Sequence, residues 1–194
     1  MVRYSTALSH IILAGTAFYC LKFTNKSNLQ FARLSFGILG VNSVLGVWRW
    51  GNPSYGHKIE KLYRLTSILQ DLLALPLIVT NIWLNYHYSL ELAYAHTLVA
   101  LFPLLAYLYN TRNIDVVDGF LAANCISLGL ISLTNQNHYG LTTMVSFTLN
   151  YFFIKRDVMG YLPGSYYDVP TQDLYNYSMC FFAYFALKAV SDCI

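Results

Sequence analysis

Seven apolar stretches, each about as long as a bilayer-spanning helix, fill this chain of 194 residues. A helix that crosses the hydrocarbon core needs about 20 apolar residues, because the core is about 30 Å thick and each residue rises about 1.5 Å. The stretches cover residues 4–23, 31–50, 62–84, 90–109, 116–134, 139–154 and 173–191. The sequence therefore predicts an all-α polytopic transmembrane helix bundle of about seven spans, or six if the short sixth stretch does not cross.

The composition agrees with a lipid-facing surface, because 56% of the residues are hydrophobic and only 11% are charged. The linkers are too short for a soluble domain, so we expect a single multipass membrane domain over residues 1–194. The 12 basic residues are scattered, which argues against a nucleic-acid partner. The expected partners are the lipid bilayer and other membrane proteins. The four cysteines show no metal-ligand spacing and are expected to pack as small apolar residues.

The distribution of basic residues predicts an orientation. With seven spans, eight of the 12 Lys and Arg residues lie on the side that holds the N-terminus, and four lie on the other side. The positive-inside rule then favours a cytosolic N-terminus and a luminal or extracellular C-terminus, in an organelle that the sequence does not specify. The glycosylation sequon at Asn25 falls on the non-cytosolic side of this arrangement.

Asp71 is the strongest local signal for a site, because it lies near the middle of the third stretch. A carboxylate at that depth costs several kcal/mol if it faces lipid, so we expect it to face the bundle and to be paired or protonated. Ser67, Gln70 and Asn81 share its side of the helix, since residues three and four apart lie on one face. Pro76, a little further on, frees a backbone carbonyl within the same helix.

Other spans carry weaker polar stripes, which are typical of helix packing or of a shared polar cavity. In the seventh span the stripe consists of Tyr177, Cys180, Tyr184 and Lys188. A cavity centred on Asp71 would need a counter-charge, and Arg49, Arg64 or a histidine could supply it. The candidate cavity residues are Asp71, Gln70, Ser67, Asn42, Arg49 and Asn150.

Two histidines, His10 and His96, lie clearly inside spans. Their depths in the predicted topology differ by roughly 10 Å, which argues against a haem held by both and favours hydrogen bonds between helices. A hydrolase could use Ser9, His10, Asp71 and Asp118 as an acid–base or metal set, but no H-E-x-x-H or G-x-S-x-G spacing supports this. No cofactor, metal or catalytic residue is therefore assigned, and enzymatic activity is not expected.

Three stretches resemble a known family. They are Ser5-Thr6-Ala7-Leu8-Ser9-His10, Leu75-Pro76-Leu77 and Asn137-His138-Tyr139-Gly140. Their order and spacing are similar to those of the transmembrane protein 276 family, whose members are small multipass proteins of similar length. The resemblance implies an integral membrane protein and supplies no reaction, substrate, cofactor or binding residue.

Two functions remain open after these observations. The first is a non-enzymatic accessory, assembly or lipid-contacting component of a membrane. The second is a small transporter or ligand-binding helix bundle that uses a polar cavity around Asp71. They differ in whether the polar residues around Asp71 satisfy one another or line an accessible space.

Overall fold

A computed structural model describes residues 3–25, 27–52, 54, 56–109, 114–155 and 171–193, and these residues contain helices and no strand. The elements are α1 (Tyr4–Phe23), η1 (Ser27–Leu29), α2 (Gln30–Gly51), α3 (Glu60–Asn85), α4 (Leu90–Leu108), α5 (Ile114–Thr134), α6 (His138–Thr148), η2 (Leu149–Lys155) and α7 (Thr171–Ser191). The short η1 is a 3-10 helix, whereas η2 is a π-helix that continues α6. Each predicted stretch corresponds to one helix, or to α6 and η2 together, so the all-helical fold is confirmed.

Among the described residues, four helices are long and apolar enough to cross a membrane, namely α1, α2, α3 and most of α5. In α4 the described apolar portion runs from Leu90 to Ala106. The eleven-residue α6 reaches its full length only through η2. The coarse prediction of a membrane protein therefore agrees with the length and composition of these helices.

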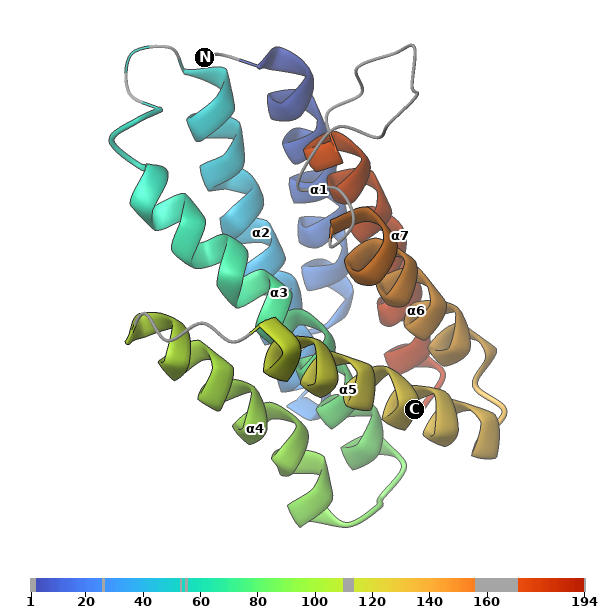
Figure 1. Ribbon diagram of the computed structural model, residues 1–194. Helices are drawn as coiled ribbons and strands as arrows, with labels where there is room; N and C mark the ends of the chain where they lie inside the picture. Colours follow the sequence, from blue (N-terminus) through green and yellow to red (C-terminus); the bar gives the residue numbers. More distant parts are fainter. Residues whose placement is uncertain are drawn as a thin grey trace.

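The third helix is the centre of the bundle. It packs against α2, α4, α5 and α7, while α1 lies between α2 and α7 and α6 lies between α5 and α7 (Figure 1). Of the 18 most apolar consecutive residues of α3, 67% are buried, against 44% of the corresponding residues in each of α1, α2 and α5. The buried polar residues of α3, such as Gln70 and Asn81, are therefore within reach of neighbouring helices.

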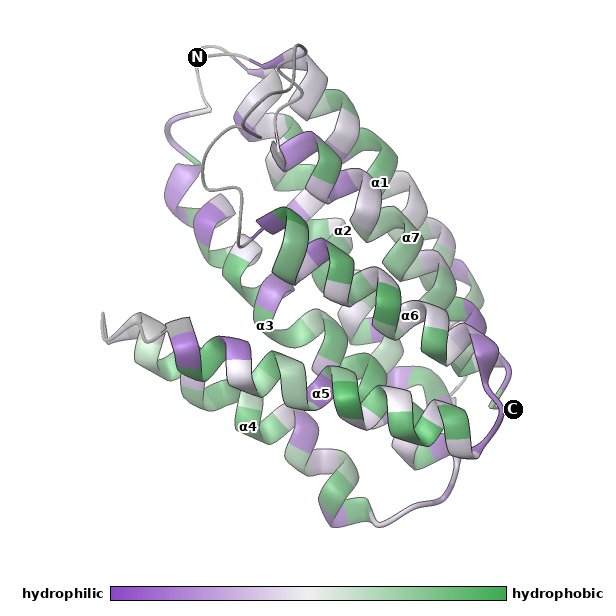
Figure 2. Ribbon diagram, turned by 45° about the vertical axis from the view of Figure 1, so that its right-hand side comes forward, coloured by the Kyte–Doolittle hydropathy of each residue, from purple (hydrophilic) through white to green (hydrophobic). Residues whose placement is uncertain are grey.

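Large apolar side chains remain exposed on the outside of the bundle, on α1, α2, α4, α5 and α6 among others. Hydrophobic residues make up much of these helices (Figure 2). Phe18, Val41, Phe102 and Ile126 are examples, each with more than half of its surface exposed. A water-soluble monomer rarely shows apolar surface on so many elements, whereas a lipid-facing bundle requires it. Hydrophilic residues gather instead around the first turns of α3 (Figure 2).

Close approach of helices depends on small residues, because lipid tails supply no hydrophobic drive between apolar helices. Gly46 of α2 packs directly on the buried ring of His10 in α1, where a Cβ atom would lie 2.4 Å from two atoms of the ring. Only glycine therefore allows α1 and α2 this separation.

Polar side chains satisfy backbone groups that the helix ends leave free. Asn81 of α3 accepts a bond from the backbone N–H of Ala32 at 3.1 Å, in the first turn of α2. Asn137 caps α6 by accepting a bond from the N–H of Gly140 at 2.7 Å. Near Pro76, the hydroxyl of Ser35 donates to the carbonyl of Ala74 at 2.8 Å. The contacts of Asn81 and Ser35 fix α2 against α3 through backbone groups, while that of Asn137 defines the start of α6.

Candidate functional site

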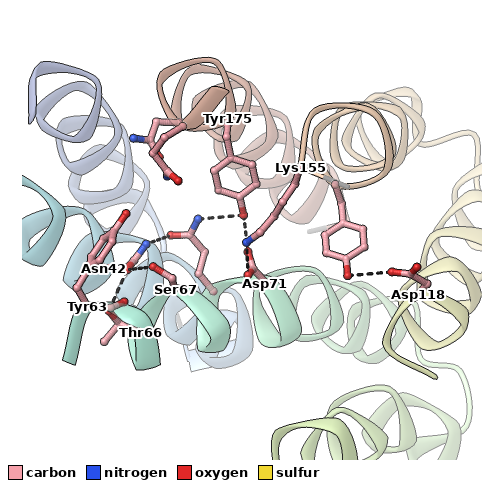
Figure 3. Close-up of polar contacts among 12 residues, drawn as sticks. Asn42, Tyr63, Thr66, Ser67, Asp71, Asp118, Lys155 and Tyr175 are labelled. Carbon is pink, nitrogen blue, oxygen red and sulfur yellow. Dashed lines mark hydrogen bonds and ion pairs between the residues drawn. The ribbon is translucent and has the colours of Figure 1, made fainter. Parts of the chain in front are cut away.

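Asp71 forms the centre of a polar cluster between α3, α7 and η2. The hydroxyl of Tyr175 donates to Asp71 Oδ1 at 2.6 Å, and the ammonium of Lys155 forms an ion pair with Asp71 Oδ2 (Figure 3). The Lys155 ammonium also lies 4.8 Å from the centre of the Tyr175 ring. The carboxylate therefore has a counter-charge and a hydroxyl donor, as its depth requires. The counter-charge is Lys155, which is none of the residues proposed for that role from the sequence.

The cluster continues from Tyr175 towards α2 through amide side chains. Gln70 donates from Nε2 to the Tyr175 hydroxyl at 3.3 Å and accepts a bond from Asn42 Nδ2 at 2.7 Å. Asn42 Oδ1 in turn accepts bonds from Thr66 Oγ1 at 2.9 Å and Ser67 Oγ at 3.1 Å (Figure 3). Asn42 and Gln70 are both almost completely buried. Four of the six candidate cavity residues are thus joined in one hydrogen-bonded chain.

These contacts join three helices and η2 by pairing polar atoms inside the bundle. A hydrogen bond between helices in a membrane contributes about 0.6 kcal/mol on average. The stabilisation from this hydrogen-bonded cluster therefore comes from the sum of several bonds. The Asp71 carboxylate already binds two donors, the Tyr175 hydroxyl and the Lys155 ammonium, so it is not available as a free base or nucleophile. The chemistry that this arrangement performs most directly is the specific association of helices.

The π-helical turn of η2 places three polar residues towards the bundle. Lys155 reaches Asp71, while the hydroxyl of Tyr151 donates to Asp118 Oδ1 in α5 at 3.0 Å (Figure 3). The third residue, Asn150, is 1% exposed, and neither polar atom of its carboxamide has a partner among the described residues. π-helical turns are rare and occur frequently at functional sites. Asn150 therefore lies outside the hydrogen-bonded chain that contains Asn42, Gln70 and Asp71.

Arg49 lies apart from this cluster, at the end of α2. Its guanidinium pairs with Glu60 at 3.1 Å, and Arg64 pairs with the other oxygen of the same carboxylate at 2.6 Å. Arg49 also lies over the ring of Trp50, with 4.9 Å between the guanidinium carbon and the ring centre. These contacts tie the end of α2 to the start of α3, where the Arg64 side chain is largely exposed and the Arg49 side chain is mostly buried.

The two histidines make separate hydrogen bonds between helices. His10 Nε2 lies 3.2 Å from the hydroxyl of Tyr63, linking α1 to α3. His96 Nε2 lies 2.7 Å from Ser127 Oγ in α5, and His96 Nδ1 lies 2.7 Å from the carbonyl of Leu92. Because a carbonyl can only accept, Nδ1 carries a proton, and in the neutral ring Nε2 accepts from Ser127. Different partners in different helices hold the two rings.

A second polar cluster joins α1 to α7. The hydroxyl of Ser9 donates to Asp173 Oδ1 at 3.3 Å, and Asn176 Nδ2 donates to Ser9 Oγ at 2.9 Å. Ser9 thus pairs with residues of α7, whereas Asp118 pairs with Tyr151. The hydrolase set proposed from the sequence is therefore divided among separate contacts. Within the described part of the chain, no group of three or more His, Cys, Asp or Glu side chains is placed to hold a metal ion.

Three features of this site were not predicted from the sequence, namely Lys155, Tyr175 and the polar start of α7. Lys155 directly follows the sixth predicted stretch and is one of the eight basic residues assigned to the side that holds the N-terminus. In the seventh stretch, the polar stripe through Tyr177 and Tyr184 is wrong as the packing face, since these residues are 37% and 42% exposed. The buried face carries Tyr175 and Asn176 instead. The only signal that could have identified it is the acidic Asp173, which shares that face.

Comparison with known proteins gives no relative. No family model matches this chain, and neither a curated protein nor a solved structure matches it. Any function must therefore be inferred from the site itself.

Proposed function

We propose that this protein is a non-enzymatic integral membrane component that acts in assembly or as an accessory subunit. The observation that carries the proposal is the mutual pairing of Asp71, Tyr175, Gln70 and Asn42 deep in the bundle. Polar residues that bond one another across helices determine a particular helix arrangement, which suits a scaffold. The apolar outer surface provides the area on which lipids and other membrane proteins pack.

In the proposed topology all seven helices cross the bilayer and the N-terminus is cytosolic. Support comes from the alternating direction of the helices, with α1 and α7 both beginning at the same end of the bundle (Figure 1). The pair formed by Arg49 and Glu60 and the exposed Arg64 lie at that end, as the positive-inside rule favours. A tag at each terminus, probed with protease in sealed vesicles, tests this orientation. A protected N-terminal tag would reverse it.

The assembly role is tested by affinity purification from the native membrane with the wild type and with Asp71→Asn. We expect the wild type to bring down a reproducible set of membrane proteins, and the variant to lose part of that set along with stability. Arg64→Gln is the matched control, because it also removes one charge from a pair but lies on an exposed surface. Equal recovery of partners with both variants would contradict the proposed role of the cluster.

A small transporter or ligand-binding bundle is the second candidate, and two observations favour it. The Lys155 side chain is 34% exposed although it pairs with the more buried Asp71, and the buried Asn150 carboxamide lacks a partner among the described residues. A titratable pair that is open on one side is a feature of proton-linked transport. Purified protein in vesicles loaded with a pH-sensitive dye distinguishes the two functions. Proton flux that disappears with Asp71→Asn and persists with Arg64→Gln would replace the assembly role.

A further inference from the structure

A groove of about 630 Å³ runs along the outer surface between α2 and α3 and reaches the end of α1. Its walls are largely apolar and include Leu21, Leu34, Gly37, Ile38, Val41 and Leu69. Gly37 forms an open part of the wall, since no atom lies within 4 Å of the position that a Cβ would take. The groove therefore has the shape and the apolar lining to hold an elongated apolar group.

The polar residues of the groove are concentrated where α2 begins. Gln30 and Arg33 both line it, and they occupy the first turn of α2. Arg33 is exposed, and within the described residues no hydrogen bond or ion pair engages its guanidinium. An arginine at the end of an apolar groove complements a negatively charged oxygen group, because its planar fork binds phosphate through paired hydrogen bonds.

The length of the groove along α2 matches the thickness of about one lipid leaflet. Along α2, the rise from Arg33 to Val41 is about 12 Å, and half of a typical hydrocarbon core is about 15 Å. Arg33 belongs to the first turn of a helix that begins at the membrane boundary in the proposed topology, so its guanidinium can reach the headgroup layer. The apolar part of the groove then lies at the depth of an acyl chain.

We infer that this groove binds one phospholipid of the leaflet nearest the start of α2, with the phosphate on Arg33 and one acyl chain along Gly37 and Val41. The inference rests on the proposed placement of the chain across a bilayer. It names a ligand class and a binding site, whereas the proposed function includes only unspecific packing of lipids on the outer surface. The chemistry selects a phosphate-bearing lipid, and an anionic headgroup is favoured because Arg33 has no carboxylate beside it in the described structure.

Native mass spectrometry of the full-length protein, released from nanodiscs of phosphatidylcholine doped with phosphatidylglycerol, tests the site. We expect one retained phosphatidylglycerol per chain in the wild type and about tenfold weaker retention in Arg33→Gln, the loss of one strong charge-assisted contact. Lys188→Gln is the matched control, since Lys188 lies in the last turn of α7 at the same end of the bundle but outside the groove. Equal losses in both variants would reduce the effect to net charge and overturn the inference.

Filling the groove gives a second, independent test. Gly37→Leu should block the acyl chain and abolish retention, whereas Gly15→Leu should leave it unchanged, because a Cβ at either glycine meets open space and only Gly37 lines the groove. Retention that survives Gly37→Leu would overturn the site. Resistance of each variant to carbonate extraction reports membrane insertion separately. In the wild type, insertion without lipid retention contradicts the groove alone, whereas loss of insertion contradicts the proposed membrane placement.

Discussion

Lys155 and Asp71 form an ion pair inside the helix bundle, between the last residue of η2 and the middle of α3. The side chains are 34% and 14% exposed, so water is partly excluded from both charges. Substitution of one partner of such a pair lowers the free energy of unfolding more than substitution of both, because a single substitution leaves one charge without its partner. This relationship gives the candidate site its most direct test.

Single substitutions of the pair should destabilise the protein more than the double substitution does. We expect Asp71→Asn or Lys155→Met to lower the free energy of unfolding by about 2 kcal/mol, less than for a fully buried pair because Lys155 is partly exposed. The double variant should recover to within about 1 kcal/mol of the wild type. Thermal unfolding in detergent micelles measures all four proteins. Additive losses would show that the two charges do not interact.

Gly46 should tolerate no side chain. In Gly46→Ala the new Cβ would lie 2.4 Å from two atoms of the buried His10 ring, so α1 and α2 must separate. We expect a net loss of about 1–2 kcal/mol, since overpacking outweighs the gain in helix propensity. Gly119→Ala is the control, because nothing lies within 4 Å of its Cβ position, and it should be neutral or stabilising. A Gly46→Ala variant as stable as this control would contradict the close approach, as read from thermal unfolding.

Asn137 should be needed for the junction between α6 and α7. Its carboxamide accepts from the N–H of Gly140 and donates to the carbonyl of Ala189 at 2.9 Å. Asn137→Ala removes a helix cap and leaves the buried carbonyl of Ala189 with only the weak thiol donor of Cys193, a loss of about 2 kcal/mol in total. Asn137→Ser keeps a cap acceptor without placing a charge against the Ala189 carbonyl, and it should lose less. Chemical unfolding curves of the two variants measure the difference, and identical losses would exclude a role of the cap.

Cys193 should react slowly with thiol reagents. The residue follows α7, and burial raises the pKa of its thiol above the ordinary value. A raised pKa lowers the thiolate fraction at neutral pH, so alkylation should be slow at pH 7 and accelerate as the pH rises beyond the usual thiol range. A variant that retains Cys193 as its only cysteine, treated with a membrane-impermeant maleimide from pH 7 to pH 10, measures the rate. A rate at pH 7 equal to that of the urea-unfolded protein would contradict the prediction.

The helices could be predicted from the sequence because they follow from a local requirement. In lipid, every backbone N–H and C=O must be paired within the segment, so an apolar stretch of about 20 residues becomes a helix. The helix α1 matches its predicted stretch at both ends, and α3 extends the prediction by only two residues at its start and one at its end. The inward orientation of Asp71 was predicted from the cost of a carboxylate facing lipid.

The partners of Asp71 could not be predicted in this way. Lys155 and Tyr175 are separated from Asp71 by 84 and 104 residues, and many other Lys, Arg and Tyr residues were equally available. The π-helical turn that carries Lys155 has no periodicity that the sequence reveals. In α7 both faces carry tyrosines, so hydropathy did not separate the buried Tyr175 from the exposed Tyr177 and Tyr184.

The sequence by itself predicted the apolar character of the helices, the helical class and the inward orientation of Asp71, because each depends on the transfer of single residues or short segments into lipid. The tertiary structure alone decided which side chains meet. In the structure Asp71 pairs with Lys155, Arg49 pairs with Glu60, and Arg33 lies exposed at the end of a groove. These outcomes depend on how helices distant in sequence approach one another, and small residues such as Gly46 set that approach by allowing backbones to come close.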